Sequence, residues 1–354
     1  MCLLNNSYVC IPGSVKNAAG KPHSFALEGD VFMWKGNEFP FKPARWLPHA
    51  NLTFEELDRI RNIRREDMEY TNENGYSVRV VHDPTLLMVL DVFHRIYLSD
   101  VNNTRLTMIF PNQWPGAYQA IAEMVNRCNV SCRNVHAFAM DEWADEDGNV
   151  APLTYGAGLG YSFRNHFYGK IREDLRPDVE QWHVFTNENK GTDVYSSIIE
   201  EIGDGGADVI YTATGWPGHT AFIDPGAPEF QAGSLEEFCK LGSRLTTETP
   251  LTICENSLLP PMGASGDVWA VPPRAVTIGP RDIVNARERF EVHSFVNADG
   301  SSWQRMISRL ELYGPISMEC PASILRLGRG ICYVSEAIAR PFGSWQNGQP
   351  DWTL

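Results

Sequence analysis

Basic residues are scarce in this chain relative to acidic ones. The sequence has 30 Lys and Arg against 44 Asp and Glu, and its formal net charge at pH 7 is −14. Nucleic acids are bound through clusters of Lys and Arg that neutralise phosphates, so this balance argues against a nucleic-acid partner. A phosphorylated small molecule is not excluded, because a local pocket of hydrogen-bond donors suffices to hold one.

Long apolar runs are absent as well. No stretch approaches the roughly 20 apolar residues of a membrane-spanning helix, and the start, MCLLNN, lacks the basic and apolar parts of a secretory signal. The eight cysteines are scattered, with no Cys-x-x-Cys pair, which favours reduced, buried thiols over a disulfide framework or a zinc site. We therefore expect a cytoplasmic protein with no membrane partner.

The composition is that of a large globular protein. Its 354 residues are 43% hydrophobic and 21% charged, which is enough to bury a core without disulfides. Residues 1–75 mix Pro, Gly and aromatic side chains irregularly and are expected to be an N-terminal extension that packs on the main body. Thr53 and Glu56 form a capping-box pattern there, which predicts a helix from Thr53 to Glu69. Residues 76–354 are expected to form one α/β domain.

From residue 76 onward, apolar β-branched runs alternate with amphipathic helical patterns. Such alternation is typical of a mostly parallel sheet with helices on both faces, so we expect a three-layer, doubly wound α/β fold. The predicted strands cover 77–81, 104–110, 134–140, 182–185, 207–212, 268–278, 291–296, 314–317 and 331–334, and the predicted helices cover 84–98, 117–126, 192–203 and 235–240.

The segment after the strand predicted at 207–212 carries a chemical signal. From residue 214 to 224 it reads Thr-Gly-Trp-Pro-Gly-His-Thr-Ala-Phe-Ile-Asp. Open α/β sheets build ligand sites at the carboxyl ends of their strands, and an imidazole oriented by a carboxylate can shuttle protons near neutral pH. His219 and Asp224 are therefore candidate catalytic residues. The alternative is a histidine that only fills a turn.

A second strand end carries carboxylates. The strand predicted at 134–140 is followed directly by Asp141 and Glu142. Acidic groups at the end of a buried strand need solvent, partners or a function, and two such strand ends suggest one shared pocket. Asp141 is a candidate base, whereas Glu142 is expected either to assist it or to cap a helix N-terminus.

Taken together, these segments resemble the glucosamine-6-phosphate deaminases (isomerases). Residues 138–143, Phe-Ala-Met-Asp-Glu-Trp, are similar to the family's Phe-Asn-Met-Asp-Glu-Tyr, and residues 215–225 are similar to its Gly-Asn-Asp-Gly-His-Ile-Ala-Phe-Asn-Glu-Pro. Residues 161–168 and 275–283 are similar to two further family segments, in the same order. The resemblance covers roughly residues 76–340 and implies the family's modified Rossmann-like fold, with a mostly parallel, doubly wound sheet.

The resemblance also implies roles for single residues. By family position, Asp141 removes the proton at C2 of the open-chain sugar, His219 moves a proton during ring opening, and Asp224 orients His219. Gly215 and Gly218, in the same turn, are expected to contact substrate. Aldose–ketose isomerisation by these steps needs no metal, so neither a metal nor a cofactor is expected. Because the family includes oligomers, a homo-oligomer is compatible with the sequence.

Three departures from the family alter its histidine and phosphate contacts. Pro217 replaces an Asp that belongs to the network around the histidine. The family's phosphate loop is replaced by Pro-Asn-Gln-Trp-Pro-Gly at 111–116, whose prolines reduce the number of free N–H groups. Leu258 stands near an expected Arg, and residues 299–303 contain no Lys. The economical interpretation is a substrate without the usual 6-phosphate.

The altered loop supplies the remaining substrate-binding candidates, which are Asn112, Gln113 and Trp114. Trp114 offers an apolar face that suits stacking on a sugar ring, and packing into the core is the equal alternative. We therefore expect a sugar isomerase or amino-sugar deaminase whose partner is a small-molecule sugar or sugar phosphate. Two other functions stay open, a sugar lactone hydrolase and a non-catalytic sugar-binding protein.

Overall fold

The computed structural model describes residues 51–111, 113–297, 301–341, 345–346 and 349–350. The chain divides into two units, residues 1–42 with 341–354 and residues 43–340. In the first unit, the antiparallel strands β12 (Trp345–Gln346) and β13 (Gln349–Pro350) pair with each other. Most of the predicted N-terminal extension lies outside the described residues, so its packing on the main body stays a prediction. Everything that follows concerns the second unit.

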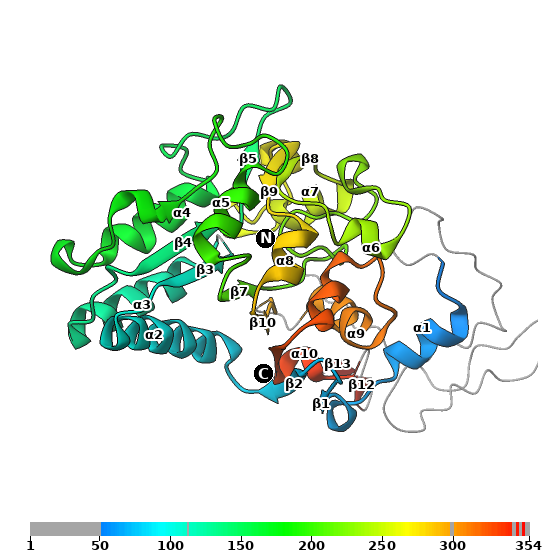
Figure 1. Cartoon of the computed structure of the whole chain (residues 1–354). Helices are drawn as coiled ribbons and strands as arrows, with labels where there is room; N and C mark the ends of the chain where they lie inside the picture. Colours follow the sequence, from blue (N-terminus) through cyan, green and yellow to red (C-terminus); the bar gives the residue numbers. More distant parts are fainter. Residues whose placement is uncertain (1–50, 112, 298–300, 342–344, 347–348, 351–354) are drawn as a thin grey trace, which may run out of the picture. The chain divides into compact units, whose positions relative to one another are not determined.

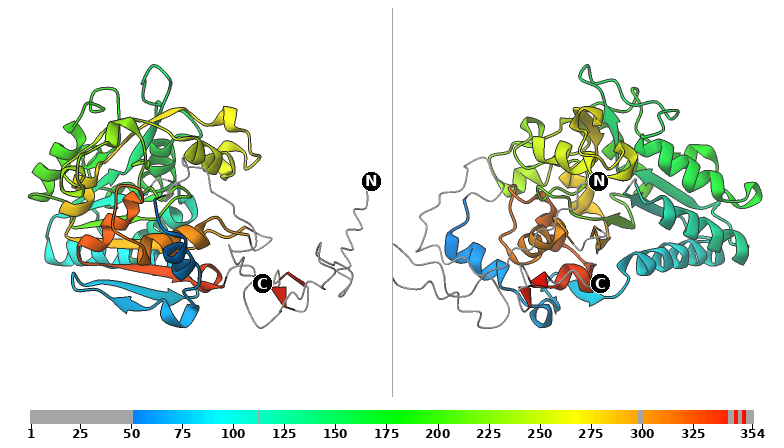
Figure 2. Two further views of the ribbon diagram at one scale, coloured as in Figure 1. Left: turned by 90° about the vertical axis from the view of Figure 1, so that its right-hand side faces the viewer. Right: turned by 180° about the vertical axis from the view of Figure 1, so that it is seen from behind.

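Eight strands form the main sheet, in the order β1-β2-β11-β10-β7-β3-β4-β6. All neighbouring pairs are parallel except β1 with β2. Strands β2 and β11 lie side by side although they come from opposite ends of the unit (Figure 2). The bounds are β1 (Tyr70–Thr71), β2 (Tyr76–Val81), β3 (Leu106–Phe110), β4 (Val135–Ala139), β6 (Trp182–His183), β7 (Val209–Thr212), β10 (Glu288–His293) and β11 (Gly330–Ser335).

Helices cover both faces of this sheet. Met108 and Phe110 of β3 pack in a cluster with α2, α3 and α4, whereas Ile109 between them packs in a cluster with α5, α8 and α10. Successive side chains of a strand point to opposite faces, so the predicted three-layer α/β fold is confirmed (Figure 1). None of the described helices is long and apolar enough to cross a membrane. The α-helices are α1 (Phe54–Arg61), α2 (Pro84–Asn102), α3 (Pro115–Cys128), α4 (Leu159–His166), α5 (Val194–Gly203), α6 (Leu235–Phe238), α7 (Pro250–Ser257), α8 (Pro280–Asn285), α9 (Gln304–Tyr313) and α10 (Glu336–Ala339).

A second, antiparallel sheet begins where β4 ends. Its strands are β5 (Asp141–Ala144), β9 (Arg274–Thr277) and β8 (Arg244–Thr247), in the order β5-β9-β8. Asp141 is the first residue of β5 and pairs with Thr277, and the N–H of Ile278 donates to the carbonyl of Met140 at 3.0 Å. The chain therefore passes from the large sheet into the small one at Met140.

The helix predicted from Thr53 to Glu69 is shorter in the structure. Thr53 caps α1 as expected, because its side chain accepts the N–H of Glu56 at 3.1 Å. The helix ends at Arg61 and buries Ile60 against α9. The guanidinium of Arg59 also donates to the carbonyl of Tyr313 at the end of α9 at 3.0 Å, and the chain then turns toward β1.

Two predicted strands also differ. The strand predicted at 268–278 begins only at Arg274, because Pro272 and Pro273 cannot donate to a ladder. The strand predicted at 314–317 is absent from the described sheets, and this segment makes only an isolated bridge between Ser317 and Cys320.

A buried polar cluster lies between β2, β10 and α9. The hydroxyl of Tyr76 donates to Glu291, and Nε2 of His293 lies 3.0 Å from Glu291 Oε1 and 3.4 Å from Glu311 Oε2. Burial raises the pKa of Glu291, but the charge of His293 and the hydrogen bonds that Glu291 makes together outweigh burial and lower it. Burial and the charge of Glu291 raise the pKa of Glu311 well above its ordinary value. Within the described residues, one set of potential metal ligands, Glu291, His293 and Cys332, has donor atoms within 4.8 Å of one another.

Candidate active site

The candidate site lies at the carboxyl ends of three neighbouring strands, β7, β3 and β4. The connection from β3 leads to β4 on one side of it, whereas β7 lies on the other side, so the chain reverses direction across the sheet at this point. Doubly wound folds bind ligands at such switch points. A cavity of about 150 Å³ opens here, and its walls include Gln113, Trp114, Asp141, His219, Phe222 and Asn256. The shared pocket expected from the two strand ends is therefore present.

The turn after β7 presents His219 to this cavity. The N–H of Gly215 donates to the carbonyl of His219 at 3.0 Å, and the N–H of Gly218 donates to the carbonyl of Gly215 at 2.9 Å. Gly218 has φ of 95°, where residues other than glycine are strained. A Cβ atom at Gly215 would overlap Nε2 of His219. Both glycines thus shape the turn around the imidazole, and their contact with substrate stays a prediction.

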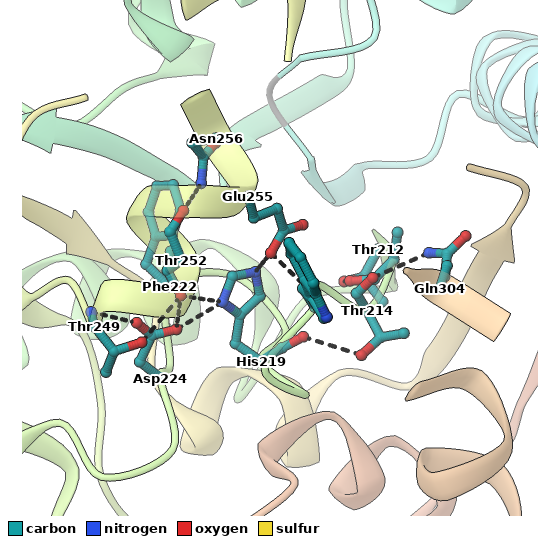
Figure 3. Close-up of polar contacts among 12 residues, drawn as sticks. Thr212, Thr214, His219, Phe222, Asp224, Thr249, Thr252, Glu255, Asn256 and Gln304 are labelled. Carbon is teal, nitrogen blue, oxygen red and sulfur yellow. Dashed lines mark hydrogen bonds and ion pairs between the residues drawn. The ribbon is translucent and has the colours of Figure 1, made fainter. Parts of the chain in front are cut away.

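Asp224 orients the imidazole of His219. Nδ1 of His219 donates to Oδ1 of Asp224 at 2.6 Å, and both side chains are buried (Figure 3). Oδ1 also accepts from the hydroxyl of Thr252 at 2.7 Å, and Oδ2 accepts the N–H of Thr249 at 2.8 Å. With both of its oxygens held, Asp224 is fixed in position, and it fixes the ring in turn.

Electrostatics favours the protonated form of His219. Burial alone lowers the pKa of His219, but the hydrogen bond to Asp224 and the charges of Glu255, Asp224 and Asp141 outweigh burial and raise it. Burial raises the pKa of Asp224, and the hydrogen bond from His219 more than offsets this, so the Asp224 pKa is lowered overall. Both shifts favour the pair of imidazolium and carboxylate, a state suited to proton donation.

Asp141 and Glu142 point in different directions, because successive residues of a strand alternate. Asp141 is buried and lines the cavity. Glu142 accepts the N–H groups of Trp143, Leu159 and Gly160 at 2.8, 2.9 and 2.6 Å, the last two at the start of α4. Burial raises the pKa of Glu142 to about 7, although these hydrogen bonds act to lower it. The helix-capping interpretation of Glu142 is therefore the one that the geometry favours.

The loop after β3 forms the opposite wall. Gln113 and Trp114 both line the cavity, and Nε2 of Gln113 is buried without a hydrogen-bond partner among the described residues. Trp114 also packs against the apolar cluster beneath α2 and α3. Its ring is therefore partly in the core and partly at the cavity, and stacking on a sugar stays a prediction. Asn112 lies outside the described residues.

The described wall of this cavity has no Lys or Arg side chain. Leu258, which stands near an expected Arg, is exposed just after α7. The described part of the wall therefore has no ammonium or guanidinium group for a phosphate.

Sequence reasoning missed two acidic residues of the site, one beside His219 and one near Asp224. Glu255 of α7 has Oε2 3.7 Å from Nε2 of His219 and accepts the N–H of Trp216 at 2.8 Å. Glu248, just after β8, is buried, and both its oxygens have no hydrogen-bond partner among the described residues. Burial and the neighbouring charges of Asp224, Asp141, Glu255 and Glu229 raise the pKa of Glu248 well above its ordinary value. The site is therefore rich in carboxyl groups.

Comparison with known proteins agrees with this geometry. No family model matches the chain. The glucosamine-6-phosphate deaminase of Phocaeicola vulgatus is 30% identical over 179 residues, which are 49% of this chain and 58% of the relative. That of Corynebacterium kroppenstedtii is 26% identical over 221 residues, 60% of this chain and 71% of the relative. The match thus spans little more than half the length of the Phocaeicola protein.

Solved structures show the same fold. A monomeric glucosamine-6-phosphate deaminase superposes with a TM-score of 0.54 at 17% identity and covers 74% of this chain and 98% of its own. The 6-phosphogluconolactonase of Trypanosoma cruzi gives a TM-score of 0.51 at 14% identity, with 78% and 99% covered. The protein therefore has the α/β fold shared by sugar-phosphate deaminases and lactonases. Its sequence is similar to glucosamine-6-phosphate deaminases over about half to three fifths of the chain.

Proposed function

We propose that this protein is an aldose–ketose isomerase or amino-sugar deaminase that uses Asp141 as the base and His219 as the acid. The observation that carries the proposal is that these two residues, from separate strand ends, line one cavity while Asp224 holds the His219 ring. A lone buried histidine or aspartate would not support it. A candidate base and a candidate acid that face the same small cavity do support it.

The proposed chemistry has two proton-transfer steps. His219, as the imidazolium, gives its proton to the ring oxygen as the C1–O bond breaks, and the imidazole takes up the C1 hydroxyl proton, so that the sugar opens to the aldehyde. Asp141 then removes the proton from C2 and returns it to C1, while a proton moves from the C2 heteroatom to the C1 oxygen, and the aldose becomes the ketose. With an amino group at C2, the product is an imine, and water replaces the imine nitrogen to release ammonia. Held and desolvated carboxylates and imidazoles supply both transfers without a metal ion.

The same proposal includes a substrate without the usual 6-phosphate. The described cavity wall carries no Lys or Arg, and the carboxyl groups of Asp141, Glu248 and Glu255 around it disfavour a dianion. Gln113 has a free buried amide group for a sugar hydroxyl, and the Trp114 ring suits the apolar face of a pyranose.

Solvent-deuterium exchange at C2, followed by NMR, tests the function. The panel holds glucosamine, galactosamine, glucosamine 6-phosphate and neutral aldoses, with Asp141→Asn as the control protein. Exchange or ketose formation with wild type, lost in Asp141→Asn at unchanged folding, supports the proposal, and preference for the unphosphorylated sugar supports the substrate class. Hydrolysis of a sugar lactone without exchange would favour a lactonase, and binding without any reaction would favour a sugar-binding protein.

A further inference from the structure

Helix α7 borders His219 on both sides of its ring. From one face of this helix, Thr252 donates to Asp224, which holds Nδ1, and Glu255 approaches Nε2 at 3.7 Å. Residues three apart on a helix share a face, so a single short helix supports both nitrogens. Figure 3 shows Asp224 and Thr252 on one side of the imidazole and Glu255 on the other.

Glu255 is held in this position. The backbone N–H of Trp216, in the histidine turn, donates to its Oε2 at 2.8 Å, and the side chain is buried. The next residue, Pro217, has neither a side-chain acceptor nor a backbone N–H. The carboxylate beside Nε2 is therefore supplied by the helix and not by the turn itself.

The distance between Glu255 and His219 leaves the Nε2 proton of His219 available to a ligand. At 3.7 Å, Glu255 and Nε2 are too far apart for a hydrogen bond, so the N–H can still donate to a ligand oxygen. Charge attraction at this distance persists in a buried site of low dielectric constant. Burial raises the pKa of Glu255 to about 7, partly offset by the charge of His219 and the hydrogen bond from Trp216.

Other charged groups also face the imidazole. Asp224 does so from the same turn and Asp141 from β5, while Glu248, after β8, acts on Asp224 and Glu255. Among these, Asp224 holds Nδ1, and Glu255 is the carboxyl group in ion-pair contact with Nε2.

We propose that Glu255 is a positioning residue that holds His219 as an imidazolium, with its Nε2 proton directed toward a bound sugar. The pairing itself stands on the geometry, whereas its catalytic consequence rests on the proposed function. Removing the charge of Glu255 then lowers the pKa of His219 and the fraction of His219 that carries the proton, without disturbing Asp141.

The test is an NMR titration of His219 in protein with ¹³C-labelled histidine. The His219→Asn variant assigns the signal. Glu255→Gln keeps an acceptor for the Trp216 N–H but loses the charge, and we expect the His219 pKa to fall by about 1 unit. Glu255→Asp keeps the charge and is expected to restore most of the loss. Glu236→Gln, on the exposed surface of α6, changes the net charge equally and is the matched control.

Two results would overturn the inference. One is an unchanged His219 pKa in Glu255→Gln, and the other is an equal shift in the Glu236→Gln control. With an active substrate, the alkaline limit of kcat/KM in Glu255→Gln should move to lower pH by the same amount as the NMR shift. The titration needs no substrate. Absence of isomerase activity would therefore contradict the proposed function, while the effect of Glu255 on the His219 pKa could still be measured.

Discussion

Nδ1 of His219 lies 2.6 Å from Oδ1 of Asp224, and the two residues belong to a single turn. Asp224 therefore supplies both the orientation and part of the charge that keeps His219 protonated. The first prediction separates these two contributions.

Asp224→Asn keeps a hydrogen-bond acceptor beside Nδ1 but removes its charge. The pKa of His219 should fall, because a negative neighbour that raises it is gone. A required imidazolium is lost as pH rises through its pKa, so the alkaline limit of activity moves to lower pH. We expect kcat to drop roughly 10²–10⁴-fold, measured as a pH profile of steady-state turnover. Wild-type kcat and an unmoved profile would remove Asp224 from the mechanism.

Gly215→Ala should damage the site more than the fold. Its added methyl group overlaps Nε2 of His219 and displaces the ring. We expect turnover to be lost while the midpoint of thermal unfolding changes little. Gly116→Ala on α3 is the matched control, since its methyl group meets open space and alanine favours helices. Equal activity in the two variants would contradict the packing seen around His219.

Substitutions at Glu142 distinguish a helix-capping role from a catalytic one. Replacement of Glu142 by Ala leaves three backbone N–H donors without an acceptor, two of them at the start of α4, which should lower the free energy of unfolding by about 1–3 kcal/mol. Glu142→Gln keeps one acceptor oxygen and should lose less. Urea denaturation measures the stabilities, and kcat is measured on the folded fraction. Wild-type stability together with lost turnover would instead give Glu142 a direct part in the reaction.

The two glutamates beside His293 should respond in opposite ways. The pKa of Glu291 is lowered, so this carboxylate stabilises the fold above its ordinary pKa and the contribution is lost as pH falls. Glu291→Gln removes the carboxylate closest to the buried Nε2 of His293 and should lower the free energy of unfolding by about 3–5 kcal/mol at neutral pH.

Burial and the charge of Glu291 raise the pKa of Glu311 well above its ordinary value, so the folded state favours the protonated form of this group. Folding must then bind a proton, a penalty that grows as pH rises above the ordinary carboxyl pKa. Glu311→Gln mimics the protonated form and should be neutral or stabilising. Chemical denaturation of both variants at two pH values checks the pair, and equal losses would contradict the assignment of a charged Glu291 and a neutral Glu311.

The central strands could be predicted because burial on both faces gives continuous apolar runs. Val135–Ala139 and Val209–Thr212 are of this kind. The small sheet lacks such a signal, because β8 reads Arg-Leu-Thr-Thr and β5 reads Asp-Glu-Trp-Ala. Their pairing with β9 depends on residues more than a hundred positions apart in the case of β5, and no local pattern encodes it.

The residues of the candidate site likewise divide into those that the sequence could identify and those that it could not. Asp141, His219 and Asp224 could be identified because each follows a strand closely in the sequence. Glu255 could not, since its contact with His219 depends on how α7 packs against the turn. The available signal was the spacing of Thr252 and Glu255, which puts both on one helix face.

The passage of the chain from one sheet to another at Met140 has an evolutionary consequence. Asp141 belongs to the small sheet and His219 to a turn anchored on the large one. The separation of the proposed base and acid is therefore set by the junction of two hydrogen-bonded ladders. We expect changes of length in the connection 225–243, between β7 and β8, to leave this separation unaltered, so that substrate preference can diverge among related proteins while the proposed proton-transfer pair is kept.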